Sequence, residues 1–228
     1  MVLFKINGER NSGTNFLTNA LKQNKFPTYV QIIKQKICYH WKHGIPREDV
    51  KLLNDNVIDI FIFRTLEEWL ISMYHNVYHL KRMKIFHDFL TTKQQSVEKQ
   101  LLDYKTNECL NADDNNKTIF EIRYYKFKKI MEYKENNKNI IFVNLGFLQC
   151  EENLVSFLQQ LNDKYMNNSI NNNYITKFCH TKIRGKNNNT DLKNRTYNID
   201  LENYKEIINN HKNEETETFI NNITIDIF

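Results

Sequence analysis

The chain alternates between short unbroken hydrophobic runs and longer segments in which hydrophobic residues are spaced. Val2–Ile6, Val57–Phe63 and Asn139–Leu145 are runs rich in β-branched and aromatic residues, and Tyr29–Ile33 is a weaker run. Such runs are typical of strands in a parallel sheet that is covered on both faces. They predict an α/β fold built on a central parallel sheet.

Between the runs, hydrophobic residues recur every three or four positions, which predicts amphipathic helices. The first helix begins at Phe16 and ends before Pro27. No repeat or linker interrupts the pattern, so residues 1–228 are expected to form a single domain. Further helices are expected at Leu66–Leu80, Ile119–Tyr133, Glu151–Leu161, Tyr197–Asn210 and Glu214–Asn221, with a polar, weakly helical segment at 81–116 and a loop at 166–198.

Composition supports a globular α/β domain. Of the 228 residues, 40% are hydrophobic and 13% are aromatic, which is enough for a sizeable core. The chain has only 5 glycines and 2 prolines, so collagen-like and Pro-rich classes are excluded. The 34 asparagines and 25 isoleucines indicate an AT-rich coding sequence, and we interpret the Asn clusters as that bias.

Charge and cysteine usage narrow the class of protein. Lys and Arg total 32 against 27 Asp and Glu, and this net charge of +5 is compatible with an anionic ligand. The sequence has no basic stripe with interleaved aromatic residues, so specific nucleic-acid binding is not expected. The four cysteines, Cys38, Cys109, Cys150 and Cys179, form no zinc pattern; we predict reduced thiols, mostly buried, and no metal site.

The sequence shows no membrane or export signal. No hydrophobic run reaches the roughly 18 residues needed to span a bilayer. The N-terminus lacks the charged and apolar regions of a signal peptide. We therefore expect a cytoplasmic protein with no membrane partner, and the sequence indicates no particular oligomeric state.

Polar segments follow three of the predicted strands. They are Gly8–Asn15, His40–Pro46 and Arg64–Ser72. In open α/β sheets, ligands bind outside the carboxyl ends of the strands. These three segments are therefore the candidate ligand-binding residues.

The first of these segments has the composition of a phosphate-binding loop. Gly8 and Gly13 permit a tight backbone path, and the helix that follows would direct its N-terminal N–H groups at an anion. Ser12 adds a hydroxyl and Arg10 adds a cation. The alternative is an ordinary strand-to-helix turn with a Ser or Thr N-cap. Thr14 stands where a Walker A motif has Lys, which disfavours a standard ATPase or kinase.

Two stretches of the chain resemble the PAPS-dependent sulfotransferases, where PAPS is 3′-phosphoadenosine 5′-phosphosulfate. Ser12, Gly13 and Thr14 match the family loop that cradles the 5′-phosphosulfate, and Asn11 and Asn15 flank them. The resemblance implies that these five residues, together with Arg10, bind the cofactor. It also implies a P-loop NTPase-like sulfotransferase fold, which is a three-layer α/β sandwich with a central parallel sheet.

The second stretch begins where the run Val57–Phe63 ends. Arg64 and Ser72 have the spacing of the family residues that hold the 3′-phosphate, with Glu68 and Tyr74 at the family's acidic and aromatic positions. The resemblance therefore implies PAPS as the cofactor and adenosine 3′,5′-bisphosphate as the product. The acceptor, whether a glycan, a small molecule or a protein, is not indicated.

A weaker resemblance concerns the catalytic base. The segment Trp41–Pro46 is similar to the family region that carries a catalytic His, which implies His43 as general base, with His40 as a competing candidate. Lys42 directly precedes His43 and lies two positions after His40. A late basic segment loosely matches another family motif, which implies that Arg184 is a further contact to the 3′-phosphate.

The family has Lys or Arg directly before its Ser-Gly-Thr, where this chain has Asn11. Either Arg10 or Lys42 must then supply the cation that stabilises the leaving phosphate, so both join His43 as candidate catalytic residues. Asn11 also supports an alternative, a catalytically silent nucleotide-binding or interaction protein of the same fold. A different P-loop phosphoryl or nucleotide transferase is a third possibility.

The leading prediction is a sulfotransferase that moves a sulfuryl group from PAPS to a hydroxyl or amine by in-line transfer. Arg123 and Lys126 lie on the basic helix Ile119–Tyr133. We favour a solvated helix face for them over one that is turned toward the cleft.

Overall fold

The computed structural model describes residues 2–29, 56–76, 82–93, 117–137, 139–167, 169–170, 199–223 and 225–226. Within them, one sheet has the strand order β1 (Leu3–Gly8), β2 (Val57–Phe63), β3 (Ile140–Asn144) and β4 (Ile225–Asp226). The helices of the described residues are α1 (Thr14–Gln23), α2 (Leu66–His75), α3 (Phe86–Thr91), α4 (Ile119–Asn136), α5 (Leu145–Leu148), α6 (Glu151–Tyr165), the 3-10 helix η6 (Leu201–Tyr204), α7 (Lys205–His211) and α8 (Glu214–Asn222).

The first three strands are parallel, as the hydrophobic runs predict. Leu3 of β1 is paired with Val57 of β2, and Asp59 of β2 is paired with Ile140 of β3. The two-residue strand β4 joins β3 in the antiparallel direction. The sequence did not predict β4, because two residues are too few to form a recognisable run.

After α1 the chain returns alongside β1. The backbone N–H of Phe4 donates to the carbonyl of Pro27 at 2.9 Å, and that of Tyr29 donates to the carbonyl of Phe4 at 2.8 Å. Thr28 thereby forms a parallel bridge to Phe4. This bridge begins where the strand Tyr29–Ile33 is predicted, and the rest of that strand lies outside the described residues.

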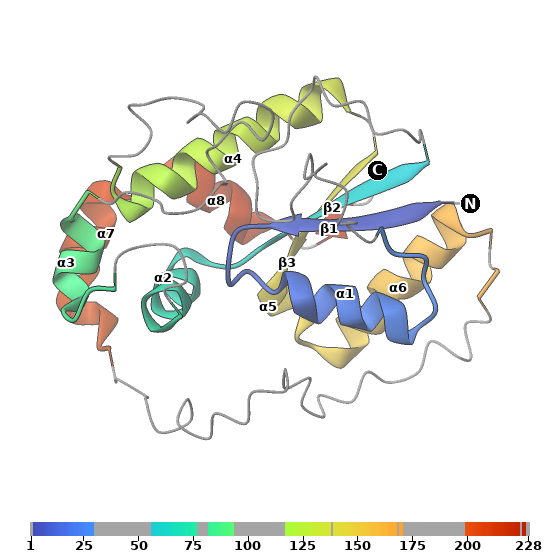
Figure 1. Cartoon of the computed structure of the whole chain (residues 1–228), viewed down its shortest axis with the longest axis horizontal. Helices are drawn as coiled ribbons and strands as arrows, with labels where there is room; N and C mark the ends of the chain where they lie inside the picture. Colours follow the sequence, from blue (N-terminus) through green and yellow to red (C-terminus); the bar gives the residue numbers. More distant parts are fainter. Residues whose placement is uncertain are drawn as a thin grey trace.

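Helices cover both faces of the sheet, which confirms a mixed α/β fold. In Figure 1, α1 and α6 lie on one face, and α4 and α8 lie on the other. The helix α5 was not predicted, because four residues show no helical periodicity. No helix of the described ranges has both the length and the apolar character that a membrane crossing requires.

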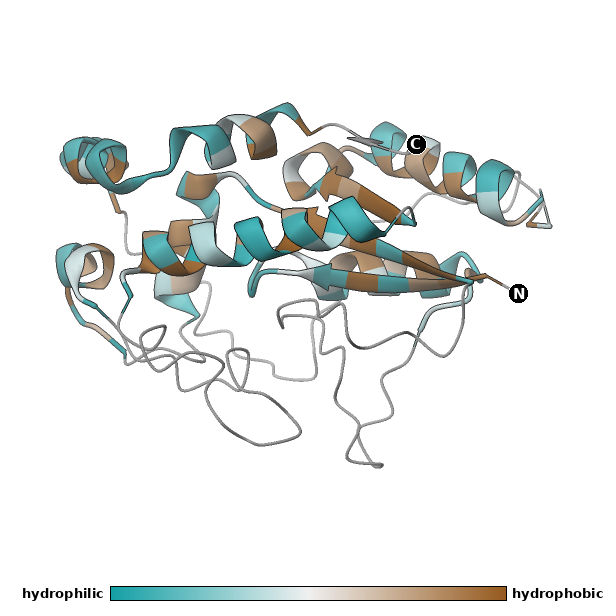
Figure 2. Cartoon of the chain, turned by 90° about the horizontal axis from the view of Figure 1, so that it is seen from above, coloured by the Kyte–Doolittle hydropathy of each residue, from teal (hydrophilic) through white to brown (hydrophobic). Residues whose placement is uncertain are grey.

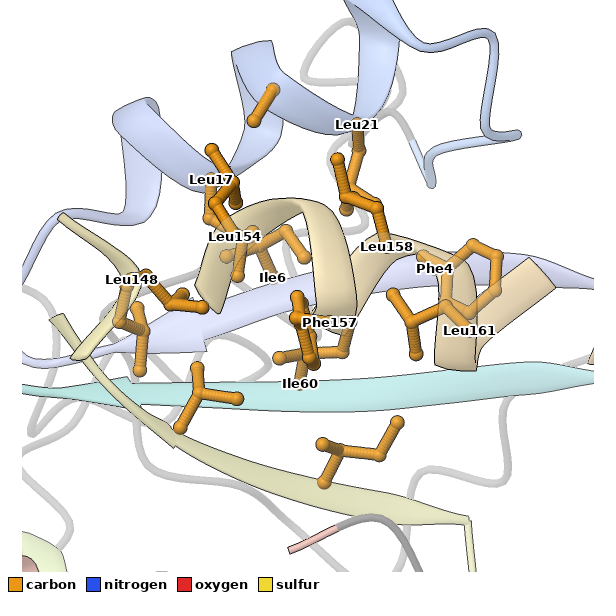
Figure 3. Packing of buried hydrophobic residues seen from close by; sticks show 14 of the residues in the cluster. Phe4, Ile6, Leu17, Leu21, Ile60, Leu148, Leu154, Phe157, Leu158 and Leu161 are labelled. Atoms are coloured by element: carbon orange, nitrogen blue, oxygen red, sulfur yellow. The ribbon is translucent and has the colours of Figure 1, made fainter. Parts of the chain in front are cut away.

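One face of the sheet packs against α1 and α6 through aliphatic side chains. Because strand residues alternate between faces, Phe4, Ile6 and Ile60 share this side (Figure 3). The apolar stripe of α6 recurs at the three- and four-residue intervals that predicted this helix. The helical side chains of this core include Leu17, Leu21, Leu148, Leu154, Phe157, Leu158 and Leu161.

Aromatic side chains fill the opposite face. The ring of Phe142 on β3 lies edge-on to those of Phe61 and Phe63 on β2, with centroids 5.9 and 5.7 Å apart. Phe127 and Tyr133 of α4 cover them from above. Figure 2 shows the strands as mostly hydrophobic, whereas the helices alternate between hydrophilic and hydrophobic positions. The sheet is therefore buried between two helical layers.

This aromatic side also contains a buried polar cluster. Lys5 Nζ lies 3.2 Å from Asp59 Oδ1, and the Asn7 side chain donates to the same oxygen at 2.7 Å. The hydroxyl of Tyr133 donates to Asp59 Oδ2 at 3.1 Å. Burial lowers the pKa of Lys5, and the charge of Asp59 opposes that change. The single carboxylate of Asp59 thus satisfies three buried donors.

One cysteine departs from the prediction of mostly buried thiols. Cys150 is exposed at the N-cap of α6, and its thiol donates to Glu152 Oε2 at 2.8 Å. The turn between α5 and α6 leaves this position at the surface, so burial was the wrong expectation for it. The other three cysteines lie outside the described residues.

Candidate anion-binding site

The carboxyl ends of the parallel strands meet at one edge of the sheet, where the sequence predicts a ligand. β1 continues into residues 9–13, here called loop 9–13, and then into α1. β2 continues through Arg64 into α2, and β3 continues directly into α5. In Figure 1 these connections leave the sheet on the same side, and loop 9–13 turns back beneath the sheet.

Loop 9–13 is a compact turn that uses the left-handed region twice. The backbone φ is 60° at Asn11 and 98° at Gly13. The N–H of Ser12 donates to the carbonyl of Glu9 at 3.2 Å, and its hydroxyl donates to the same oxygen at 2.6 Å. Asn enters the left-handed region more readily than most residues. Asn11 is therefore suited to its backbone position, beyond any compositional bias.

Two glycines, Gly8 at the end of β1 and Gly13 in loop 9–13, are needed for close packing. A Cβ on Gly13 would lie 2.7 Å from Leu145 Cδ1, and a Cβ on Gly8 would lie 2.5 Å from the carbonyl oxygen of Ile62. The end of β1 therefore lies close to β2, and loop 9–13 lies close to the first residue of α5. The tight backbone path expected from Gly8 and Gly13 is the one the structure has.

The N-terminus of α1 differs from that of every other helix in the described residues. Its N-cap is Gly13, no side chain caps it, and its first turn contains no acidic residue. Each other described helix has an acidic first-turn residue, a capping side chain, or both. The helix dipole makes such an end electropositive. This end of α1 is suited to an anion from outside the helix.

Arg64 adds a guanidinium at the end of the neighbouring strand. Its side chain is half-buried, and its Nε is buried with no hydrogen-bond partner among the described residues. Burial lowers the pKa of Arg64, and Glu68 opposes this change. An arginine stays protonated in proteins nonetheless. A buried cationic donor without an acceptor gains stability when an anion binds.

α2 brings the second predicted motif against loop 9–13. The side-chain amide of Asn11 donates to the carbonyl oxygens of Ser72 and Asn76, each at 3.3 Å. The indole of Trp69 donates to the carbonyl of Arg10 at 3.0 Å. The backbone of Ser72 and the loop are thus neighbours. Asn11 holds the loop to α2 and supplies no charge.

Arg123 of α4 is buried at the same edge and is only 1% exposed. Its Nε and Nη2 donate to the two carboxylate oxygens of Glu217 at 2.8 and 2.9 Å, and its Nη1 donates to Glu9. Nη2 also donates to the carbonyl of Arg64 at 2.8 Å. Burial by itself lowers the pKa of Arg123, but Glu9 and Glu217 outweigh it and raise the pKa. The guanidinium therefore stays charged and joins both strand ends.

Lys126 lies one turn after Arg123 and is 8% exposed. Burial lowers its pKa to about 8, the charge of Glu9 opposes this effect, and the charge of Arg10 adds to it. Burial raises the pKa of Glu9, against the pull of Arg123 and Lys126. The edge therefore contains a second buried cation, Lys126, which interacts electrostatically with Glu9 and Arg10 of loop 9–13.

The solvated helix face favoured for Arg123 and Lys126 is therefore wrong. Arg123 lies four residues from both Ile119 and Phe127, so it occupies the apolar stripe of α4. That spacing is the sequence signal that could have identified it. Glu217 gave no comparable signal, because nothing in the sequence links it to a helix 94 residues away.

The remaining predicted site residues divide into two groups. Thr14 begins α1 with a buried side chain, and Asn15 follows it with an exposed one. Arg10 is half-buried in loop 9–13. The other group, namely His40, Lys42, His43 and Arg184, lies outside the described residues.

The donor chemistry of this edge is cationic and amide-based. Within the described ranges, no group of three or more His, Cys, Asp or Glu side chains is arranged to hold a metal ion. No family model, no curated protein and no solved structure matches this chain.

Proposed function

We propose that the protein binds a phosphate-bearing nucleotide at loop 9–13 and acts as a sulfotransferase that uses PAPS. One observation carries the proposal. The uncapped N-terminus of α1 lies at the same edge of the sheet as Arg64, whose buried Nε has no partner in the described residues. Helix N-terminal N–H groups and an adjacent guanidinium are a common phosphate-binding combination.

In this proposal, the first-turn N–H groups of α1 hold the 5′-phosphosulfate, while Arg64 and Ser72 hold the 3′-phosphate. The acceptor oxygen or nitrogen attacks sulfur in line, and the bond from sulfur to the bridging phosphate oxygen breaks. The acceptor proton passes to a base, for which the sequence resemblance indicates His43. The charge that develops on the leaving phosphate is stabilised by the helix end and by cations such as Arg10.

A second candidate is a nucleotide-binding protein without transferase activity. Asn11 favours it, because a neutral amide committed to α2 stands where the sulfotransferase loop has a cation. Both candidates predict nucleotide binding, and they differ only in the transfer step.

Calorimetric titration with adenosine 3′,5′-bisphosphate tests the binding step. We expect saturable binding that Arg64→Ala weakens about 10- to 100-fold, the loss typical of a charge-assisted hydrogen bond. Arg82→Ala, which removes the same charge from an exposed position, should leave the affinity unchanged. Tighter binding of Mg²⁺–ATP than of the bisphosphate would contradict the proposal.

Transfer is tested with sulfate-labelled PAPS and a panel of hydroxyl and amine acceptors. Labelled product from any acceptor supports the sulfotransferase. Tight binding of the bisphosphate, with no transfer to any acceptor, supports the silent nucleotide-binding protein.

A further inference from the structure

The guanidinium of Arg123 contacts four residues that come from three distant parts of the sequence. It contacts Glu9 in loop 9–13, the carbonyl of Arg64 after β2, and Glu217 on α8. Its fourth contact is the indole ring of Trp69 on α2, whose centroid lies 4.9 Å from Cζ. Among the described residues whose side chains are fully buried, Arg123 is the largest.

These contacts fix loop 9–13 at two points. Arg123 binds the side chain of Glu9 directly. Trp69, stacked on Arg123, donates its indole N–H to the carbonyl of Arg10. One guanidinium also binds the carbonyl of Arg64, so it sets the position of the loop relative to the second anion-binding element. A displacement of such a group by about 1 Å can lower the rate of a catalysed reaction by up to about 100-fold.

Glu217 in turn fixes the guanidinium. Its two carboxylate oxygens bind Nε and Nη2, the paired geometry in which carboxylates orient arginine most firmly. Glu217 is buried, so solvent cannot replace it at Arg123. Buried ion pairs contribute little net stability compared with apolar residues of similar size. The desolvation cost of burying Arg123 and Glu217 is therefore better explained by a need to position the guanidinium than by a need for stability.

We propose that Arg123 is a positioning residue of the anion site, and that Glu217 makes the C-terminal helix α8 a working part of that site. The proposal rests on the proposed function. α8 itself contributes no group to the ligand. It orients Arg123, Arg123 holds Glu9 and the Arg64 carbonyl, and these two hold loop 9–13 in its binding conformation.

The experiment compares Glu217→Gln with Glu215→Gln, which removes the same charge from an exposed position on the same helix. The first readout is amide hydrogen exchange of residues 9–13 in the free protein. We expect faster exchange in Glu217→Gln and no change in Glu215→Gln. The second readout is the calorimetric affinity for adenosine 3′,5′-bisphosphate, which Glu217→Gln should weaken about 3- to 30-fold.

Two results would overturn the proposal. One is unchanged exchange of residues 9–13 in Glu217→Gln. The other is a uniform rise in exchange across the whole sheet, which would give Glu217 a merely structural role. If Glu217→Gln does not fold, Glu217→Asp, which keeps the charge and shortens its reach, is measured in the same way. A wild-type protein that binds no bisphosphate would refute the proposed function, while the exchange readout would still test the link from α8 to the loop.

Discussion

The N-termini of α1 and α4 solve the same electrostatic problem in opposite ways. α4 carries a complete capping box, in which Thr118 accepts from the N–H of Glu121 at 3.3 Å and Glu121 accepts from the N–H of Thr118 at 2.6 Å. α1 begins at Gly13 with neither a capping side chain nor a first-turn acid. Capping stabilises a helix by roughly 1 kcal/mol. α1 instead keeps the positive end of its dipole uncompensated by an acid of its own first turn, at the edge of the sheet that also holds Arg64 and Arg123.

Among the tests of this difference between α1 and α4, a substitution at the N-cap of α1 should have the largest effect. Gly13→Ala forces an L-residue to φ 98° and brings its Cβ to 2.7 Å from Leu145, so the loop must move. We expect a loss of stability on the order of 1–3 kcal/mol. Affinity for adenosine 3′,5′-bisphosphate should fall by about 10- to 100-fold, measured by calorimetry on the folded protein.

Gly146→Ala is the matched control for Gly13→Ala. Its Cβ would lie 3.2 Å from a side-chain oxygen of Asn144, so the substitution also crowds a neighbour, but it requires no positive φ and lies outside loop 9–13. It should leave affinity unchanged. Equal losses of affinity in both variants would show that the effect reflects general destabilisation and not the shape of loop 9–13.

The next largest effect is expected on the pH dependence of anion affinity. Because burial lowers the pKa of Lys126 to about 8, its ammonium group is mostly charged at pH 7 and mostly neutral at pH 9. A bound anion favours the charged form, so affinity should fall as pH rises through 8, by about five- to tenfold over this range. Calorimetry at both pH values should show this fall in the wild type.

Lys126→Met should remove the pH dependence by lowering affinity at pH 7 to its value at pH 9. Lys128→Met, an exposed neighbour on α4, should retain it. A fall that persists unchanged in Lys126→Met would assign the titration to another group.

The smallest effect comes from making α1 resemble α4. Asn15→Asp places a carboxylate in the first turn of α1, where it should stabilise the free protein by about 0.3–1 kcal/mol and weaken anion binding a few-fold by competition. Thermal unfolding and calorimetry measure the two effects. Thr118→Ala makes the opposite change, because it removes the cap of α4. It should lower stability by about 1 kcal/mol and leave affinity unchanged. If Asn15→Asp were to strengthen anion binding, α1 could not be the anion-binding end.

Sequence patterns predicted the parts of the fold that rest on local periodicity. The strand predicted at Val57–Phe63 is β2 itself, and α6 follows the spacing of its leucines. β4 escaped prediction because its pairing with β3 depends on tertiary contact and not on its own two residues.

In the candidate site, too, the residues with a local sequence signal were predicted and those that depend on tertiary contacts were not. Gly8, Gly13 and Arg64 could be selected as candidates because the signals for them lie in neighbouring residues or in a fixed spacing. The joining of Glu9 to Glu217 through Arg123 was not, because a contact across 94 residues leaves no periodic signal at either end. The charge of Arg123 suggested solvent, whereas its place on the apolar stripe of α4 indicated burial.

The buried pair of Lys5 and Asp59 has a consequence for how the strands align during folding. These two residues face each other in the register of β1 and β2. A shift of one residue would place Lys5 opposite Ile60 and would turn its side chain to the aliphatic face, which would separate the two charges while both remained buried. Hydrophobic strands such as β1 and β2 tolerate many alignments by apolar contact alone. In the native register, each buried charge faces the other. The ion pair therefore favours this register, which also fixes how far the carboxyl end of β1 reaches relative to that of β2.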